Sequence, residues 1–288
     1  MAKSTAKRKR IGLALGGGGA RGLAHVGVIR VLVEAGLPID YIAGTSIGAL
    51  VGGFYAATGD LDLLDQTFSR LRRKDIASLG KILMNRDGAL FRDASVPELL
   101  RSTVARKSIE DCAIPFAAVA TDVKNGDAVV MRTGSMDTAI RASIALPLIF
   151  QPVKRDDRLL MDGGFSDPVP ADVVRQMGAD YVIAVDVTSQ WVNTADEKVS
   201  WTNLYDIVSN ALSVIEFQLS REILKHADIV LRPAVLQHGW LAFDRAGELI
   251  VAGADVAHEE LKDICRQAGY SPPDETPIEH LIDFIRGR

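Results

Sequence analysis

Residues 11–57, with the sequence IGLALGGGGARGLAHVGVIRVLVEAGLPIDYIAGTSIGALVGGFYAA, decide the fold class of this chain. The apolar run 11–15 predicts a buried strand, and apolar residues spaced by three and four over 23–35 predict a helix that stops at Gly36. Residues 39–43 predict a second strand, and another helix is expected from the turn at 44–48 to about residue 57. This alternation is typical of an α/β fold with a parallel sheet covered by helices.

The rest of the sequence continues the alternation. Strands are expected over residues 115–121, 127–132, 159–161 and 181–187, and helices over 135–144, 171–177, 202–225, 253–268 and 277–286. The length of 288 residues fits one large domain or two small ones, and no repeat or low-complexity linker marks a second. We therefore expect a basic flexible tail over 1–10 and a single domain over 11–288, with its motifs in 11–187 and a helical part at about 200–288.

The composition limits the class of protein. A hydrophobic fraction of 48% and a charged fraction of 24% are ordinary for a soluble globular protein, and the net charge of −4 gives no general attraction to nucleic acid. Cys112 and Cys265 form no CxxC pair, which argues against a disulfide scaffold or a cysteine zinc site. No apolar run approaches the length of about 20 residues that a membrane span needs. A cytoplasmic protein is expected, with transient peripheral contact at the inner face of the membrane left open.

The pentapeptide 44–48, Gly-Thr-Ser-Ile-Gly, marks Ser46 as a candidate nucleophile. It lies where the second predicted strand meets a helix, so Ser46 must sit on a sharp turn, and Gly44 and Gly48 allow such a turn. The helix that follows directs its first N–H groups at the serine, which favours developing negative charge. The alternative is a glycine-rich turn that only packs two elements closely.

The glycine-rich stretch 16–22 follows the first strand and opens the first helix. Such a loop presents several backbone N–H groups toward one point and Arg21 adds a positive charge, so Gly17, Gly18, Gly19 and Arg21 are candidates for an oxyanion hole. The stretch also satisfies G-x-G-x-x-G, the dinucleotide pattern. That pattern needs an acidic residue at the end of the second strand, where this chain has Gly-Thr-Ser, and the Lys-Ser/Thr of a P-loop is missing too.

A third element, Asp162-Gly163-Gly164, follows a short apolar strand. A carboxylate at a strand end followed by two glycines can approach another loop closely, although Asp-Gly is also a favoured turn sequence.

Together with Ala142-Ser143-Ile144-Ala145-Leu146-Pro147, these three elements resemble the blocks of the patatin-like phospholipase family, in particular its bacterial members. The resemblance implies a three-layer α/β/α fold with a mainly parallel central sheet. It also implies a Ser46–Asp162 dyad without histidine, an acyl-enzyme intermediate, a lipid ester substrate, and neither a cofactor nor a metal ion. A free aspartate has a pKa near 3.9 and is a weak base at neutral pH, so we expect a desolvated site that raises the pKa of Asp162.

Two other functions stay open. A Ser-His-Asp hydrolase is compatible with the chain order, because four histidines follow Asp162: His226, His238, His258 and His280. Ser46 nevertheless follows only one strand–helix unit, which is early for that fold. A non-catalytic or regulatory protein on the same fold is the other alternative, since intact motifs do not guarantee turnover.

Overall fold

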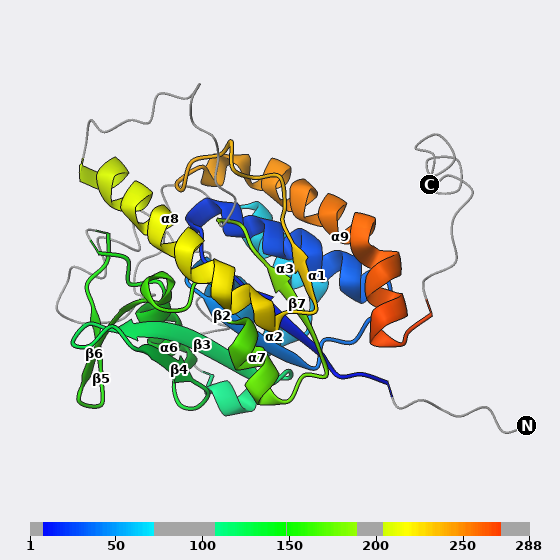
Figure 1. Ribbon diagram of the computed structural model, residues 1–288, viewed down its shortest axis with the longest axis horizontal. Helices are drawn as coiled ribbons and strands as arrows, with labels where there is room; N and C mark the ends of the chain where they lie inside the picture. Colours follow the sequence, from blue (N-terminus) through cyan, green and yellow to red (C-terminus); the bar gives the residue numbers. More distant parts are fainter. Residues whose placement is uncertain (1–7, 72–106, 148, 189–203, 272–288) are drawn as a thin grey trace, which may run out of the picture.

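The computed structural model describes residues 8–71, 107–147, 149–188 and 204–271 (Figure 1). Its strands are β1 (Ile11–Leu15), β2 (Tyr41–Thr45), β3 (Phe116–Asp122), β4 (Ala128–Met131), β5 (Val153–Arg155), β6 (Arg158–Asp162), β7 (Tyr181–Val185) and β8 (Ile229–Leu231). Its α-helices are α1 (Ala24–Glu34), α2 (Ile47–Thr58), α3 (Leu61–Ser69), α6 (Met136–Ser143), α7 (Ala171–Met177), α8 (Leu204–Ile223) and α9 (Ala246–Ala268). Short 3-10 turns include η1 (Gly19–Leu23), η3 (Gly163–Phe165) and η5 (Phe243–Arg245). The expected helix at 277–286 lies outside the described residues.

The strands form one mixed sheet, linked in the order β5-β6-β3-β2-β1-β7-β8, with β4 also paired to β3. The pairs β1–β2, β1–β7, β2–β3 and β7–β8 are parallel, whereas β4 and β6 run antiparallel to β3 and β5 runs antiparallel to β6. The expected α/β fold with a mainly parallel sheet is confirmed. Strands β5 and β8 were not expected, because three residues are too few to establish an alternating pattern.

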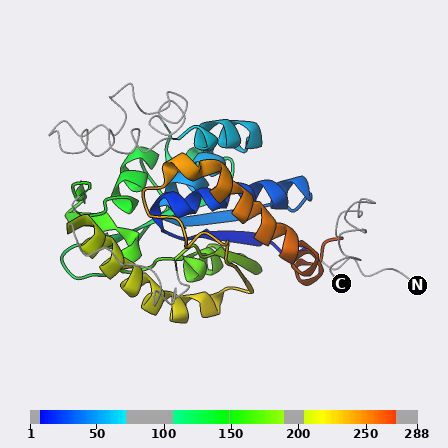
Figure 2. The same ribbon diagram turned by 90° about the horizontal axis from the view of Figure 1, so that it is seen from above.

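Helices cover both faces of the sheet, which gives three layers (Figure 2). Helices α1, α2, α3, α6 and α9 lie on one face, and α7 and α8 lie on the other. Successive strand residues alternate between the two cores, so Leu13 and Leu15 pack with α1 and α2 while Ala14 packs with α7. Small alanines on the second face let α7 approach the sheet closely.

The described part of the N-terminal segment contacts the body of the protein. Arg8 forms an ion pair with Asp40, and Arg10 forms one with Asp180, each through two guanidinium nitrogens. The chain therefore makes specific contacts from residue 8 onward.

Helix α9 begins at Ala246, seven residues before the expected start, since the glycines at 247 and 253 obscure its periodicity.

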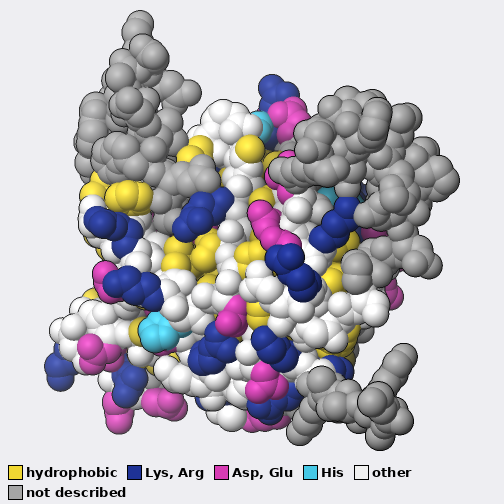
Figure 3. Space-filling view, turned by 45° about the vertical axis from the view of Figure 1, so that its right-hand side comes forward, with side chains coloured by type: hydrophobic (Ala, Val, Ile, Leu, Met, Phe, Trp, Pro, Cys, Tyr) yellow, Lys and Arg dark blue, Asp and Glu magenta, His cyan; other side chains and the backbone are white. Residues whose placement is uncertain are grey.

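The surface carries both signs of charge. On the face drawn in Figure 3, Lys and Arg side chains are interspersed with Asp and Glu. Across the described ranges, none of the helices combines the length and the apolar character that crossing a bilayer requires.

Candidate active site

Ser46 occupies a strained turn between β2 and α2. Its backbone has φ 55° and ψ −123°, a conformation that non-glycine residues rarely adopt. A Cβ atom on Gly44 would lie 2.4 Å from the carbonyl carbon of Gly48, and one on Gly48 would lie 2.1 Å from the carbonyl oxygen of Leu15. Both glycines are therefore required for α2 to start this close to β1 and β2, and the turn lifts the Ser46 side chain away from the sheet.

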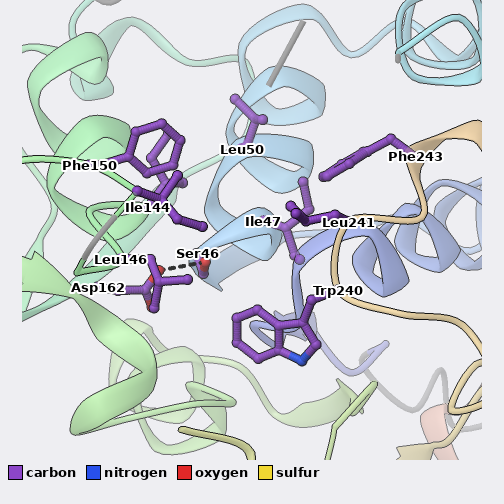
Figure 4. Close-up of a pocket in the computed structure, with 12 residues that line it drawn as sticks. Ser46, Ile47, Leu50, Ile144, Leu146, Phe150, Asp162, Trp240, Leu241 and Phe243 are labelled. Atoms are coloured by element: carbon purple, nitrogen blue, oxygen red, sulfur yellow. Dashed lines mark hydrogen bonds between the residues drawn. The ribbon is translucent and has the colours of Figure 1, made fainter. Parts of the chain in front are cut away.

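The hydroxyl of Ser46 donates a hydrogen bond of 2.7 Å to Oδ2 of Asp162 (Figure 4). The other carboxylate oxygen, Oδ1, accepts from the backbone N–H of Gly164 at 2.9 Å. Asp162 is 1% exposed. Burial raises the pKa of Asp162 to about 6, against the opposing effect of the hydrogen bonds from Gly164 and Ser46. A carboxylate with this pKa is a better proton acceptor near neutral pH than a free aspartate.

The pairing of β3 explains why these two side chains meet. β3 pairs with β2 up to Thr45↔Val119 and then with β6 from Ala120↔Asp162. Strand β4 pairs with β3 residues that overlap both stretches, so β2 and β6 share the opposite edge of β3. Because β6 is antiparallel, its last residue, Asp162, arrives beside the end of β2, and Ser46 is the residue that follows β2 directly.

The segment 142–146 holds both residues in place. The hydroxyl of Ser143, which is fully buried, accepts the backbone N–H of Ser46 at 2.9 Å and donates to the carbonyl of Val119 at 2.6 Å. Two residues later, the carbonyl of Ala145 accepts the backbone N–H of Asp162 at 3.1 Å. This segment thus fixes the backbone of the nucleophile and of its partner at the same time.

The glycine-rich loop lies beside Ser46. The N–H of Gly17 donates to the carbonyl of Pro168, and the N–H of Ala20 donates to the carbonyl of Trp240. The N–H groups of Gly18 and Gly19 have no acceptor within the described ranges. Both glycines have positive φ, 145° and 59°, and Gly19 lines the pocket that contains Ser46.

Arg21 connects this loop to a distant part of the chain. Its guanidinium donates from Nε to the carbonyl of His238 and from a terminal nitrogen to the carbonyl of Leu236. We call residues 232–242, between β8 and η5, the C-terminal loop. A Cβ atom on Gly19 would lie 2.5 Å from the carbonyl oxygen of Trp240, so the two loops are in direct backbone contact.

A largely apolar pocket opens beside Ser46 and Asp162 (Figure 4). Its aliphatic and aromatic lining comes from three places: α2, the segment after α6, and the C-terminal loop with η5. The residues are Ile47, Leu50, Ile144, Leu146, Ile149, Phe150, Trp240, Leu241 and Phe243. An apolar lining of this kind, next to a serine hydroxyl, suits a hydrocarbon chain beside a reacting carbonyl group.

The hydrogen bonds given for Ser46 and Asp162 involve no histidine among the residues that the structure describes. His25 is fully buried, its Nε2 donates to the carbonyl of Gly16, and burial lowers its pKa to about 4. His238 lies near Glu248, and His280 falls outside the described ranges. Within these ranges, no group of three His, Cys, Asp or Glu side chains is arranged to hold a metal ion.

A serine hydrogen bonded to a buried carboxylate, beside a glycine-rich loop on a mainly parallel sheet, is an arrangement that suits a serine hydrolase. The patatin-like phospholipase family model matches residues 13–175, more than half of the chain. The chain belongs to this family, which is a family of hydrolases.

Individual relatives cover the same region. A patatin-like phospholipase domain-containing protein of Caenorhabditis elegans is 40% identical over 201 residues, 68% of this chain and 14% of the relative. An uncharacterized NTE family protein of Mycobacterium tuberculosis is 40% identical over 222 residues, 72% of this chain and 60% of the relative. This chain therefore matches only part of each relative. Among solved structures, VipD from Legionella pneumophila matches with a TM-score of 0.50 and 14% identity, over 89% of this chain and 67% of VipD, a likeness of fold alone.

Sequence patterns did not single out several residues of this site. Ser143 belongs to a block that pointed to the site only through its resemblance to the family, and nothing local shows that its side chain reaches Ser46. Trp240, Leu241 and Phe243 come from the helical part whose role the sequence left undefined. They lie beside Gly19 and Ser46 in space but about 200 residues away in the sequence, and hydrophobic periodicity does not predict contacts between such distant segments.

Proposed function

We propose that this chain is a serine lipid-acyl hydrolase that cleaves carboxylic ester bonds of phospholipids or related lipids through a Ser46–Asp162 dyad. The observation that carries the proposal is the 2.7 Å hydrogen bond from Ser46 Oγ to Asp162 Oδ2 at a strained strand-to-helix turn. The membership of the family supports the lipid substrate.

In the first half-reaction, Ser46 Oγ attacks the ester carbonyl carbon while its proton passes to Asp162 Oδ2. The tetrahedral intermediate collapses when the C–O bond to the leaving alcohol breaks, and protonated Asp162 returns the proton to the alkoxide. An acyl group then remains on Ser46. In the second half-reaction, water gives a proton to Asp162 and attacks the acyl carbon, which releases the fatty acid and restores the Ser46 hydroxyl.

For the oxyanion hole, we favour the backbone N–H groups of Gly18 and Gly19 over the wider set that the sequence indicated. These two donors are free of backbone acceptors in the described part of the chain, whereas the N–H of Gly17 is bonded to Pro168. Donors held in advance at the place where charge develops contribute strongly to catalysis. Arg21 then acts on the hole indirectly, because it holds the C-terminal loop against Gly19.

The apolar pocket would hold the acyl chain. Aliphatic and aromatic side chains surround Ser46, and the carboxylate in the lining is that of Asp162, the hydrogen-bond partner of Ser46. Each methylene moved from water into such a pocket gains about 0.8 kcal/mol, or about fourfold in kcat/KM. Reactivity should therefore rise with acyl length until the pocket is full.

We also propose a cytoplasmic location with transient membrane contact during lipid access. Cys112 and Cys265 are free thiols, which supports a reducing compartment. Fractionation of cells that produce the chain, with and without a salt wash of the membranes, tests this placement.

The test of the function uses a fluorophosphonate probe and p-nitrophenyl butyrate. Ser46→Ala should abolish labelling, and Asp162→Asn should lower kcat by about 10²- to 10⁴-fold, the range for a general base. Ser69→Ala and Asp157→Asn, which alter exposed residues outside the pocket, are matched controls and should behave as wild type.

Three results would oppose the proposal. Full activity in Asp162→Asn would remove the dyad. Loss of labelling in a folded His238→Ala or His258→Ala variant would favour a Ser-His-Asp mechanism. A wild-type chain that neither labels nor hydrolyses esters, in buffer and with phospholipid vesicles, would favour a non-catalytic protein on this fold.

A further inference from the structure

Helix α8 places a carboxyl group in the interior that the proposed mechanism does not use. Glu216 is 0% exposed, and neither of its carboxyl oxygens has a hydrogen-bond partner among the residues that the structure describes. A buried polar group without a partner costs free energy that folding must offset elsewhere. Helix α8 also lies beyond residues 13–175, to which the family model matches.

The carboxyl of Glu216 lies between the two loops that carry the proposed chemistry. Its Oε1 is 2.6 Å from the place where a Cβ atom on Gly164 would lie, and 3.2 Å from that of a Cβ atom on Gly17. Gly17 belongs to the glycine-rich loop, and Gly164 donates its N–H to Asp162. A side chain at position 164 would collide with Glu216, so the glycine at this position leaves room for the Glu216 carboxyl.

Three charged groups face Glu216: Asp162 at the end of β6, Asp186 after β7, and Arg21 in η1. The side chain of Asp162 accepts two hydrogen bonds and that of Glu216 accepts none from the described part of the chain, so negative charge is better stabilised on Asp162. Burial, and after it the charges of Asp162 and Asp186, raise the pKa of Glu216 well above its usual value, while Arg21 lowers it. Glu216 therefore keeps its proton when Asp162 is ionised.

We propose that Glu216 is a positioning residue of the active site, whose carboxyl is wedged between Gly17 and Gly164 and sets the spacing between the oxyanion loop and the proton acceptor. The proposal rests on the function proposed above. The protonated side chain fills the gap without adding a charge. Loss of its proton at alkaline pH places a second negative charge against Asp162, which forces the two loops apart.

A positioning role predicts that replacing Glu216 lowers kcat and leaves KM nearly unchanged. Glu216 does not line the substrate pocket, so its replacement should leave the KM for p-nitrophenyl butyrate within about twofold. A small displacement of catalytic groups is costly, so Glu216→Ala should lower kcat by about tenfold or more. Glu216→Gln keeps the shape but cannot ionise. It should restore most of kcat at pH 7.5 and remove the alkaline fall in kcat that we expect of the wild type.

The experiment measures kcat and KM from pH 6 to pH 10 for wild type, Glu216→Ala and Glu216→Gln. Glu222→Gln, an exposed position on the same helix paired with Lys225, is the matched control and should follow the wild type. Fluorophosphonate labelling of wild type and Ser46→Ala, run first, decides the proposed function separately.

Three outcomes overturn the role of Glu216. The first is a Glu216→Ala variant with wild-type kcat, whatever its melting temperature. The second is a Glu216→Gln variant that keeps the alkaline fall of the wild type. The third is a wild type without such a fall. If Glu216→Ala does not fold, the comparison of Glu216→Gln with wild type decides the question alone.

Discussion

Lowering the pH should inactivate the enzyme through protonation of Asp162. Burial raises the pKa of this carboxyl to about 6. At pH 5, one unit below this value, about one tenth of Asp162 is ionised and able to accept the Ser46 proton. A free aspartate, with a pKa of about 3.9, would still be more than about 90% ionised at that pH. We therefore expect kcat/KM at pH 5 to be about a tenth of its plateau value.

The assay is hydrolysis of p-nitrophenyl butyrate from pH 4.5 to pH 8, quenched at one fixed alkaline pH so that the product absorbs equally in every sample. The ratio kcat/KM is the informative quantity, because it reports groups of the free enzyme. His25 does not interfere, since its pKa is lowered to about 4. A value of kcat/KM at pH 5 above half of the plateau would refute the assignment of Asp162 as a desolvated base.

The same pKa has a consequence for stability. Between 3.8 and about 6 the unfolded chain loses the Asp162 proton while the folded chain retains it, so stability falls as pH rises through this window. The full shift corresponds to about 3 kcal/mol above pH 6. Asp162→Asn escapes this cost and should melt at a higher temperature than the wild type at pH 8, with the difference shrinking toward pH 4. An equal difference at both pH values would contradict the linkage.

Three further substitutions probe the surroundings of the dyad. Ser143→Ala removes the acceptor of the Ser46 N–H and should lower kcat by about tenfold with KM unchanged, the effect of a misplaced nucleophile; a loss confined to KM would contradict this. Trp240→Ala shortens the pocket wall and should reduce the kcat/KM ratio of octanoate to acetate esters, and an unchanged ratio would remove Trp240 from the acyl site. Gly19→Ala places a Cβ atom 2.5 Å from the Trp240 carbonyl at a φ of 59°, so kcat should collapse even if the melting temperature falls only slightly. Wild-type turnover in Gly19→Ala would show that this loop does not shape the oxyanion hole.

Local signals in the sequence were sufficient for the central strands and their motifs. The bounds expected for β1 and α7 agree with the structure to the residue, because β1 lies between a run of basic residues and Gly16, and α7 lies between Pro170 and Gly178. Gly44 and Gly48 predicted a sharp turn at Ser46, and their steric surroundings require glycine at both positions. Motifs of this kind are local, so single-sequence reasoning can recognise them.

The parts that the sequence did not reveal depend on contacts between distant residues. Arg21 was expected to add a positive charge to the oxyanion hole, and no sequence pattern showed that its guanidinium also binds carbonyls more than 200 residues away. Glu216 has the pattern of any polar residue on a surface helix, and only the packing of α8 against η3 shows that it is buried. Periodicity predicts which face of a helix is apolar, but it does not predict which loop lies beneath it.

The antiparallel strand β6 explains how the carboxylate of the proposed dyad reaches Ser46 without a histidine between them. In a purely parallel sheet, strand ends emerge side by side, with a spacing of about 4.8 Å, and a histidine commonly spans the gap between serine and carboxylate. Here β6 continues along the edge of β3 where β2 stops, and it runs in the opposite direction. Its terminal carboxylate therefore meets Ser46 directly, at 2.7 Å. A one-residue slip of β6 would turn Asp162 to the other face of the sheet, so the register of this strand is as necessary to the proposed dyad as the two side chains.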